Sequence, residues 1–415
     1  MQDQGNSRRP PLSDFDPIGI LGEWEGYEVT GIRRTPGRKG GKPPQIRIEL
    51  SPREDRPGRC SGCGRRVASV HDTTVRVVRD LPILDSQTYL VVPRRRLACR
   101  RCGPKLERLS WLSSWGRVTN RLVESVARLC QQMAIKHVAR YFGLSWDRVK
   151  GIDKRWLRRS LGEVDLSGVE LIAMDEFAIQ KGHRYATVIV EPLRKRVLWV
   201  GRGRGREDIR PFFELLGPEG CARIKAIAMD MSGAYREEVS LHCPQAEIVY
   251  DLFHVVARYG REVVDRVRVD EANRLRRDPK GRAVVKGARW LLLRNYANIE
   301  KREDRIRLQE LLAANNKIAK VYILKDDLKH LWDYHYRGAA LRFWNAWYHR
   351  AVRSRIAPLV KFAKNLKAHL SAILSHCRWW LSTSLLEGIN NKIKVIKRVA
   401  YGFRDDEYFF LKIRA

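Results

Sequence analysis

Two aspartates, Asp175 and Asp230, each close a short apolar run in the middle of the chain. The runs read LIAMD and IAMD. A continuous apolar run is typical of a strand buried on both faces, and a carboxylate at the carboxyl end of such a strand lies where α/β sheets bind ligands. If the two strands are neighbours, these side chains lie about 5 Å apart. Two such carboxylates favour a bound divalent cation, which suits metal-assisted phosphodiester chemistry.

Several residues compete for roles around this pair. Glu176 is the rival of Asp175, because adjacent strand residues face opposite sides of a sheet and only one of them should enter the site. Asp175 and Asp230 can each also be an ordinary turn residue at the end of a strand. Asp251 and His254 follow the next apolar run, AEIVY. They can form an auxiliary ligand pair, or Asp251 can cap a helix and His254 can be a core imidazole.

A third acid, Glu387, stands near the start of an amphipathic helix that we predict close to the C-terminus. Asn391, Lys394 and Arg398 share its polar face, opposite an apolar stripe. A helix packed on the sheet by that stripe could present Glu387 to the two aspartates, and Lys394 and Arg398 to a polyanion. Alternatively, Ser384 and Glu387 form a capping box, and the residues alone leave both roles open.

Four cysteines form two Cys-x-x-Cys-Gly motifs, Cys60 with Cys63 and Cys99 with Cys102. Such pairs supply the four thiolates of a tetrahedral Zn²⁺ site, and the residues between them can hold a hairpin. Unligated cysteines or a redox pair are the alternatives. Because four thiolates leave no coordination position open, we expect a structural zinc ion.

A helix-turn-helix is predicted between residues 135 and 157. Ala139 allows close contact of two helices, Gly143 suits a turn that needs a positive φ, and Val149 returns the second helix to the core. Ser145 can cap that second helix. An ordinary helical hairpin fits the same pattern. If the motif binds DNA, the exposed side chains that can enter the major groove include Trp146, Arg148, Lys150 and Lys154.

The charge of the chain indicates its class of partner. Lys and Arg total 81 and Asp and Glu total 47 in 415 residues, a formal net charge of +34. A globular protein this basic usually binds nucleic acid, with an anionic membrane surface as the competing partner. The sequence has no apolar run long enough to span a membrane and no signal-peptide pattern, so we expect a cytoplasmic, nucleoid-associated protein. The candidate phosphate contacts near the cysteines are Arg95, Arg96 and Arg101.

The order of patterns along the chain predicts several domains. Short strand-like segments such as QIRIEL and TYLVVP come first, helical periodicity follows, and apolar strands then alternate with helices as in a mixed α/β sheet. We predict a disordered tail at 1–17, a β-rich zinc-binding domain at 18–110, a helix-turn-helix domain at 111–165, the α/β sheet at 166–254, a helical region at 255–381 and the final helix at 382–415.

Three segments resemble a known family. MDEFA, DLFHVV and EGINNKIKVIKRVAYGFRDDEYFFLKI are similar to the ISL3 group of insertion-sequence transposases. The resemblance implies a DDE enzyme whose ribonuclease-H-like catalytic domain is interrupted by an all-helical insertion, here 255–381. It further implies Asp175, Asp230 and Glu387 as the acids that hold Mg²⁺ or Mn²⁺. The resemblance also favours Asp175 over Glu176 as the first acid, and a catalytic role over a capping role for Glu387.

We therefore expect a multidomain α+β DNA transposase that binds the terminal repeats of its element and joins freed ends to target DNA. Its partner would be double-stranded DNA, bound by a homodimer or higher oligomer, because two ends must be cut together. The alternative is a catalytically silent DNA-binding regulator derived from a transposase. A tyrosine recombinase based on Tyr401 beside Arg398 is disfavoured, because the remaining Arg and His residues of that constellation are not evident.

Overall fold

The computed structural model describes residues 24–38, 40–41, 43–113, 116–180, 182, 184–381 and 384–415. The tail predicted at 1–17 lies outside these ranges. The chain forms two compact units, Met1–Gly162 with Arg398–Phe403, and Glu163–Lys397 with Arg404–Ala415. Across the described ranges, every helix is too short or too polar to cross a membrane.

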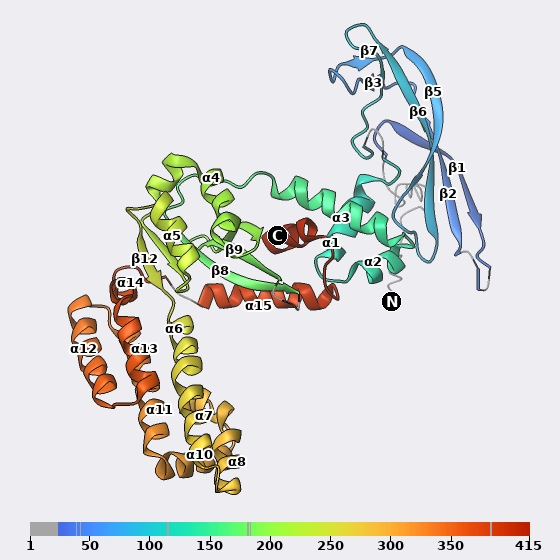
Figure 1. Ribbon diagram of the computed structural model, residues 1–415. Coiled ribbons are helices and arrows are strands. Elements are labelled where there is room, and N and C mark those ends of the chain that lie inside the picture. The colour runs from blue at the N-terminus through green and yellow to red at the C-terminus, as the bar shows by residue number, and fades with distance from the viewer. Residues whose placement is uncertain are drawn as a thin grey trace, which may run out of the picture. The chain divides into compact units, whose positions relative to one another are not determined.

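The first unit begins with a β-rich domain, drawn in blue in Figure 1. Its main sheet has the strand order β1-β2-β6-β5, with β7 paired to β6, and only the β2–β6 pairing is parallel. Ile48, Leu90 and Val92 are fully buried in its core. The predicted strands QIRIEL and TYLVVP fall in β2 and β6. The strands are β1 (Tyr27–Thr35), β2 (Gln45–Pro52), β3 (Gly58–Arg59), β4 (Arg66–Val67), β5 (Val70–Arg79), β6 (Gln87–Cys99) and β7 (Gly103–Leu106).

The predicted helix-turn-helix is confirmed in the same unit. Its helices are α1 (Asn120–Cys130), α2 (Ile135–Phe142) and α3 (Trp146–Leu161). Gly143 ends α2 with φ 61° and ψ 39°, and the Ser145 hydroxyl accepts a hydrogen bond from the Arg148 amide at 3.4 Å. Ala139 and Val149 are buried between the helices. The turn chemistry therefore sets the angle between α2 and α3.

The second unit contains the mixed sheet, with strand order β10-β9-β8-β11-β12. β8, β9 and β10 pair antiparallel, whereas β11 and β12 run parallel to β8. The strands are β8 (Leu171–Gln180), β9 (Arg184–Glu191), β10 (Arg196–Arg202), β11 (Ala226–Met229) and β12 (Glu247–Tyr250). The expectation that Asp175 ends its strand is wrong: β8 continues to Gln180, because β9 pairs with it beyond the point where β11 stops.

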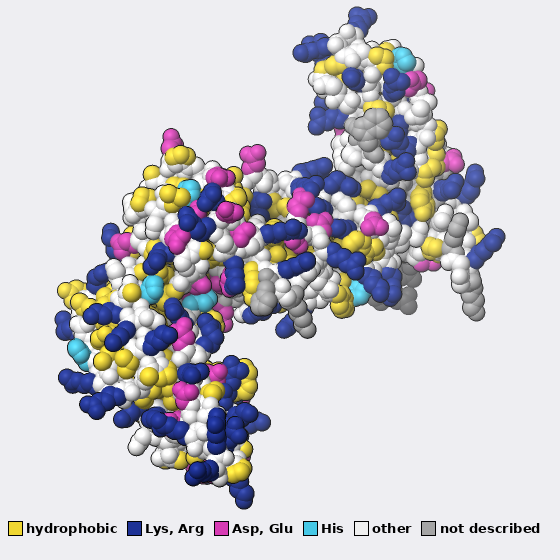
Figure 2. Space-filling view, in the orientation of Figure 1, with side chains coloured by type: hydrophobic (Ala, Val, Ile, Leu, Met, Phe, Trp, Pro, Cys, Tyr) yellow, Lys and Arg dark blue, Asp and Glu magenta, His cyan; other side chains and the backbone are white. Residues whose placement is uncertain are grey.

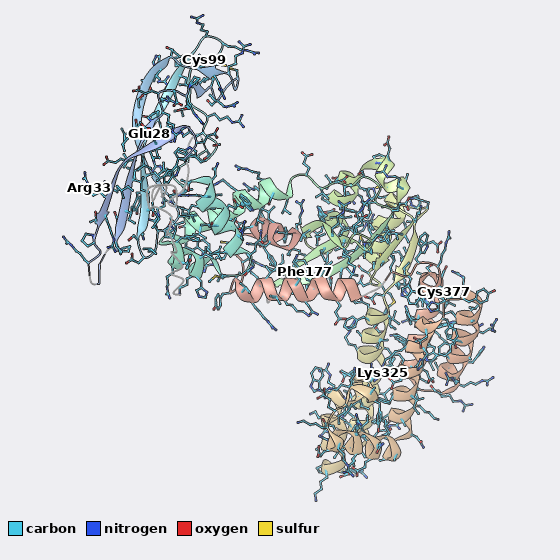
Figure 3. The ribbon with its side chains drawn as sticks, turned by 180° about the vertical axis from the view of Figure 1, so that it is seen from behind. Glu28, Arg33, Cys99, Phe177, Lys325 and Cys377 are labelled. Carbon is cyan, nitrogen blue, oxygen red and sulfur yellow. The ribbon has the colours of Figure 1, made fainter. Side chains whose placement is uncertain are left out.

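Helices cover both faces of this sheet. Ile172 and Met174 face a core shared with α4 (Arg206–Arg223) and α5 (Gly233–His242). On the other face, Phe177 (Figure 3) packs edge-on against Phe409 of α16 (Asp406–Arg414) at 5.9 Å. The last long helix, α15 (Ser384–Val399), also lies on this face, where Lys397 Nζ donates to the Ala178 carbonyl at 2.6 Å. Figures 1 and 3, from opposite sides, both show α15 alongside the sheet.

A helical region separates β12 from α15. Trp344 and Trp347 are fully buried there, as expected for aromatic residues at helical spacing, whereas Trp380 is 74% exposed. Lys325 is also buried and donates to the carbonyls of Leu292 and Arg294, both at 2.8 Å. The elements are α6 (Leu252–Tyr259), a π-helix (Gly260–Val264), α7 (Asp265–Arg274), α8 (Pro279–Gly287), α9 (Arg289–Leu293), α10 (Arg302–Ala314), α11 (Asn316–Lys329), α12 (Arg337–Arg353), α13 (Ala357–Lys367) and α14 (Leu370–Leu374), with 3₁₀ turns at Tyr296–Asn298, His330–Asp333 and Ser375–Cys377.

The turn at Gly143 gives a test of the helix-turn-helix. A Cβ at this positive φ would lie 2.2 Å from Gln87 Nε2. We expect Gly143→Ala to weaken local stability by about 1–2 kcal/mol. Gly151→Ala, inside α3, is the matched control and should be neutral or stabilising by up to about 1 kcal/mol. Amide hydrogen exchange of peptides covering α2 and α3 measures both, and equal protection in the two variants would contradict the assigned turn.

Candidate active site

Asp175 and Asp230 lie side by side on neighbouring strands. The parallel register pairs Ala228 with Ala173. Continuing it by two residues places Asp230, just after β11, opposite Asp175 on the same face of the sheet. Asp175 is 5% exposed and Asp230 is half-buried. The two strands are thus neighbours, as the prediction required, and the charge of Asp230 acts on Asp175.

Each aspartate is held by hydrogen bonds from nearby groups. Asp175 Oδ1 accepts from the Glu176 amide at 2.8 Å, and Asp175 Oδ2 accepts from Asn390 Nδ2 at 2.6 Å. Asp230 Oδ1 accepts from the Ser232 amide at 3.0 Å. The two carboxylates are thus oriented before any ligand arrives.

Burial changes the acid strength of this pair. It raises the pKa of Asp175 and the pKa of Asp230, because both carboxylates lose solvation when charged. Mutual repulsion adds to the rise for Asp175. A cation between them would reverse both effects, and buried oxygen donors suit a hard divalent ion such as Mg²⁺. The residues present therefore fit such a metal.

Glu176 points to other partners. Its carboxylate oxygens accept from Arg204 Nη1 at 3.1 and 3.2 Å. The register pairs Asp175 with Asp230, but Glu176 also lines the cavity beside Asp230, and its negative charge adds to the raised pKa of Asp230. Glu176 differs from Asp175 by its ion pair with Arg204.

Asp251 and His254 extend the acidic cluster. Asp251 caps α6 by accepting from the Phe253 amide at 2.7 Å, so the capping alternative is confirmed. His254 is no isolated core imidazole: its Nδ1 lies 3.3 Å from Asp251 Oδ2 and its Nε2 lies 3.6 Å from Asp175 Oδ1. Burial lowers the pKa of His254, but the nearby carboxylates of Asp251, Asp175 and Asp230 outweigh it and raise the pKa. These carboxylates therefore favour the protonated form of the imidazole.

Glu387 is not in contact with the two aspartates. It is exposed on α15, and the described residues show no hydrogen bond or ion pair between it and Asp175 or Asp230. The α15 residue that reaches Asp175 is Asn390, which the sequence analysis missed. Its spacing of three from Glu387, on one helical face, was the available signal. The alternative capping role of Glu387 involves the Ser384 side chain, which lies outside the described residues.

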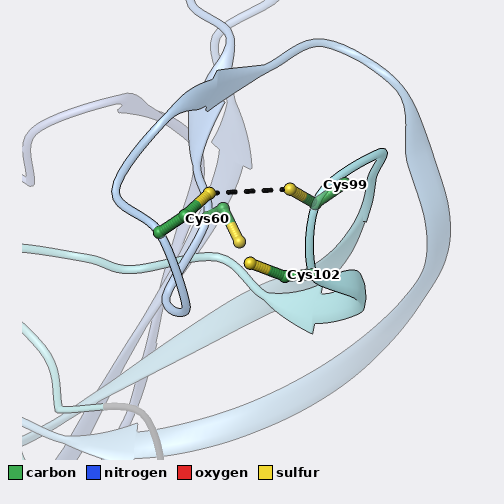
Figure 4. A group of neighbouring side chains, drawn as sticks. Cys60, Cys99 and Cys102 are labelled. Atoms are coloured by element: carbon green, nitrogen blue, oxygen red, sulfur yellow. Dashed lines mark hydrogen bonds between the residues drawn. The ribbon is translucent and has the colours of Figure 1, made fainter.

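The four cysteines form one cluster, as predicted. The Sγ atoms of Cys60, Cys63, Cys99 and Cys102 all lie within 4.8 Å of one another, and Figure 4 shows the labelled side chains pointing toward a common centre. Backbone hydrogen bonds from Cys102 and Arg101 lower the pKa of Cys99, which favours a thiolate. The expected hairpin between the two motifs is the β5–β6 pair. This donor set fits a structural Zn²⁺ ion.

The basic side chains predicted to contact DNA differ in their surroundings. Arg95 lies in a nearly buried ion pair with Glu107 at 2.5 Å, which corrects its assignment as a phosphate contact. Arg96 is exposed but pairs with Asp72 at 2.9 Å. On α3, Lys150 Nζ lies 5.6 Å from the ring centroid of Trp146. Lys154 is half-buried, and the exposed residues are Arg101, Trp146, Arg148, Lys394 and Arg398. Figure 2 shows Lys and Arg side chains over much of the visible surface.

Comparison with known proteins covers nearly the whole chain. Family models match residues 172–413 (transposase), residues 107–157 (helix-turn-helix domain of transposase family ISL3) and residues 56–102 (zinc-finger of transposase IS204/IS1001/IS1096/IS1165). The chain is 54% identical over 398 residues to the transposase for insertion sequence element IS1001 of Bordetella parapertussis, covering 95% of this chain and 96% of the relative. It is 28% identical over 389 residues to the transposase for IS1557 of Mycobacterium tuberculosis, covering 88% and 86%.

The cysteine cluster predicts a defined metal content. We expect the purified protein to carry about one Zn²⁺ per chain, because four thiolates complete a tetrahedral site. Cys102→Ser should lose this zinc and lower the melting temperature of the first unit. Cys377→Ser, in the second unit, should keep it. Elemental analysis and thermal unfolding measure both effects, and a Cys102→Ser protein with full zinc content would refute the site.

Proposed function

Because the chain belongs to the ISL3 family of insertion-sequence transposases, we propose that Asp175, Asp230 and Glu387 hold the divalent ions, Mg²⁺ or Mn²⁺, that its DNA chemistry uses. The observation that carries this proposal is the parallel register of β8 and β11, which pairs Ala228 with Ala173 and so carries Asp230 to the level of Asp175. The pKa values of both carboxylates are raised, and a cation between them would favour their ionised forms.

Glu387 completes the set through the position of α15. Asn390 bonds to Asp175 and Lys397 bonds to Ala178, so α15 follows β8 in the same direction. Glu387 precedes Asn390 by three residues, about 4.5 Å along the helix axis. Its exposed side chain can therefore turn toward the aspartates when a cation and DNA are present.

The cavity beside Asp230 suits a phosphodiester. It measures about 600 Å³, and Asp230, Glu176, His254 and Ser232 line it together with the cations Arg204, Arg258 and Arg261. The arginines can bind phosphate oxygens of the strand that enters. When bound, the metal ions would activate the attacking oxygen and stabilise the leaving one. Asp175 and Asp230 would hold those ions, and the imidazole of His254 lies beside Asp175.

The strand order supports a ribonuclease-H-like catalytic domain. Three antiparallel strands are followed by two parallel ones, and Asp175 lies on the first of these strands in chain order, β8, while Asp230 directly follows the fourth, β11. We assign this domain to residues 166–254 and 382–415, and the helical insertion to 255–381. The zinc-binding and helix-turn-helix domains are assigned to 18–110 and 111–165.

The first unit supplies DNA recognition. Its helix-turn-helix places Trp146 and Arg148 at the exposed start of α3, the part of a recognition helix that contacts base edges. Lys150, Lys154, Arg96 and Arg101 add positive charge for the backbone, as Lys394 and Arg398 do from α15. We propose that this unit binds the terminal repeats of the element. A dimer or larger assembly would hold two ends for joint cleavage and for transfer to target DNA.

The metal pair predicts loss of excision without loss of binding. Asp230→Asn removes one charge of the pair, so excision of a donor element with native ends should fall by on the order of 100-fold or more. Gel-shift binding to those ends should be unchanged. Asp165→Asn, an exposed acid of the same unit, is the control and should excise normally. Normal excision by Asp230→Asn would overturn the proposed metal site.

The position of Arg148 on α3 predicts different effects on binding to the terminal repeat and on binding to unrelated DNA. Arg148→Ala should weaken binding to the terminal repeat by about 1–3 kcal/mol if Arg148 contacts a base edge, with much less effect on unrelated DNA. The control is Arg128→Ala on α1, where the arginine pairs with Glu124 at 2.9 Å. Fluorescence anisotropy at several salt concentrations measures both variants. An equal loss on both DNAs would instead make Arg148 a phosphate contact.

A further inference from the structure

Asn390 occupies an unusual position for a neutral side chain. It comes from α15, 215 residues after Asp175 in sequence, and its Nδ2 donates to Asp175 Oδ2 at 2.6 Å. Its own Oδ1 is buried and has no hydrogen-bond partner among the described residues. The amide nitrogen of Asn390 thus bonds to Asp175, whereas the amide oxygen has no hydrogen-bond donor among the described residues.

The chemistry of an amide explains its use at this point. A lysine or arginine would also bond to Asp175, but its positive charge would compete with a divalent cation. An amide donates one N–H to the carboxylate without adding charge, and it keeps an oxygen free. Amide oxygens are ordinary ligands of hard divalent ions, either directly or through a bound water molecule.

The neighbouring Asn391 shows that the position is specific. Asn391 is exposed, and its Oδ1 accepts from Lys394 Nζ at 3.2 Å. The two asparagines are adjacent on one helix, yet only Asn390 turns toward the sheet. Helix periodicity separates them by about 100° around the axis. Asn391 is therefore a matched control in residue type and in helix position.

We infer that Asn390 is a further ligand of the metal centre, with its amide oxygen on the cation side and its amide N–H₂ on Asp175. This inference rests on the proposed function of Asp175 and Asp230. It adds a fourth oxygen donor to the two aspartates and Glu387. It also links α15 to β8 at the site, so cation binding and the docking of α15 stabilise each other.

The test is Mn²⁺ binding to the full-length, zinc-loaded protein without DNA, measured by electron paramagnetic resonance. Asn390→Ala should weaken Mn²⁺ affinity about 10-fold or more, which is the usual effect of removing such a partner. Asn391→Ala should bind like the wild type. Asn390→Asp restores an oxygen donor of nearly the same shape, so it should bind Mn²⁺ more tightly than Asn390→Ala. Circular dichroism of metal-free samples checks that each variant is folded.

The outcomes separate this inference from the proposed function. If Asp230→Asn binds Mn²⁺ as well as the wild type, the proposed metal site at Asp175 and Asp230 is wrong. If Asp230→Asn loses Mn²⁺ while Asn390→Ala matches Asn391→Ala, the pair stands and the role of Asn390 is overturned. An Asn390→Asp protein that binds no better than Asn390→Ala also overturns it, since the side chain would then act only by holding Asp175.

Discussion

The parallel pairing of β8 with β11 is the constraint on which the rest of the catalytic unit depends. It aligns Ala228 with Ala173 and so carries Asp230 to the level of Asp175. A slip of one residue would pair Glu176, which forms an ion pair with Arg204, with Asp230 in place of Asp175. The buried apolar residues on the other face fix this register, because Ile172 and Met174 must enter the same core as Ile227 and Met229. Hydrophobic packing thus sets the register that pairs Asp230 with Asp175.

The burial that fixes the register also raises the free-energy cost of ionising Asp175 and Asp230 when no cation is bound. The pKa values of both carboxylates are raised, and amide hydrogen bonds and the nearby imidazole of His254 favour their ionised forms. Asp251 ties that imidazole to the first turn of α6. Asp175 and Asp230 are therefore held mainly by neutral amide donors, which a bound cation can displace. A strong internal salt bridge, as between Arg95 and Glu107, would instead remove an acid from use.

The sequence predicted those features that depend on short-range interactions. The apolar runs before Asp175 and Asp230, the positive φ of Gly143, the Ser145 cap and the two cysteine motifs all follow from short-range chemistry, and each is present in the structure. The continuation of β8 past Asp175 could not be predicted, because it depends on pairing with β9. The choice of Asn390 over Asn391 depends on the rotation of α15 against the sheet. Only tertiary packing sets that rotation, so the polar face assigned from the sequence missed the residue that reaches Asp175.

The helical region between β12 and α15 explains how residues so far apart in sequence come together. It starts directly after β12, and it returns to the same strand: His369 packs edge-on against Tyr250 at 5.5 Å, and Arg378 pairs with Glu247 at 2.5 Å. Trp344 and Trp347 are fully buried in it, and they belong to the same hydrophobic core cluster as Ile172 and Met174 of β8. Both ends of the helical region therefore lie at β12, close to the sheet on which α15 packs. The chain can then lay α15 along β8 and bring Asn390 to Asp175, as a short connection would.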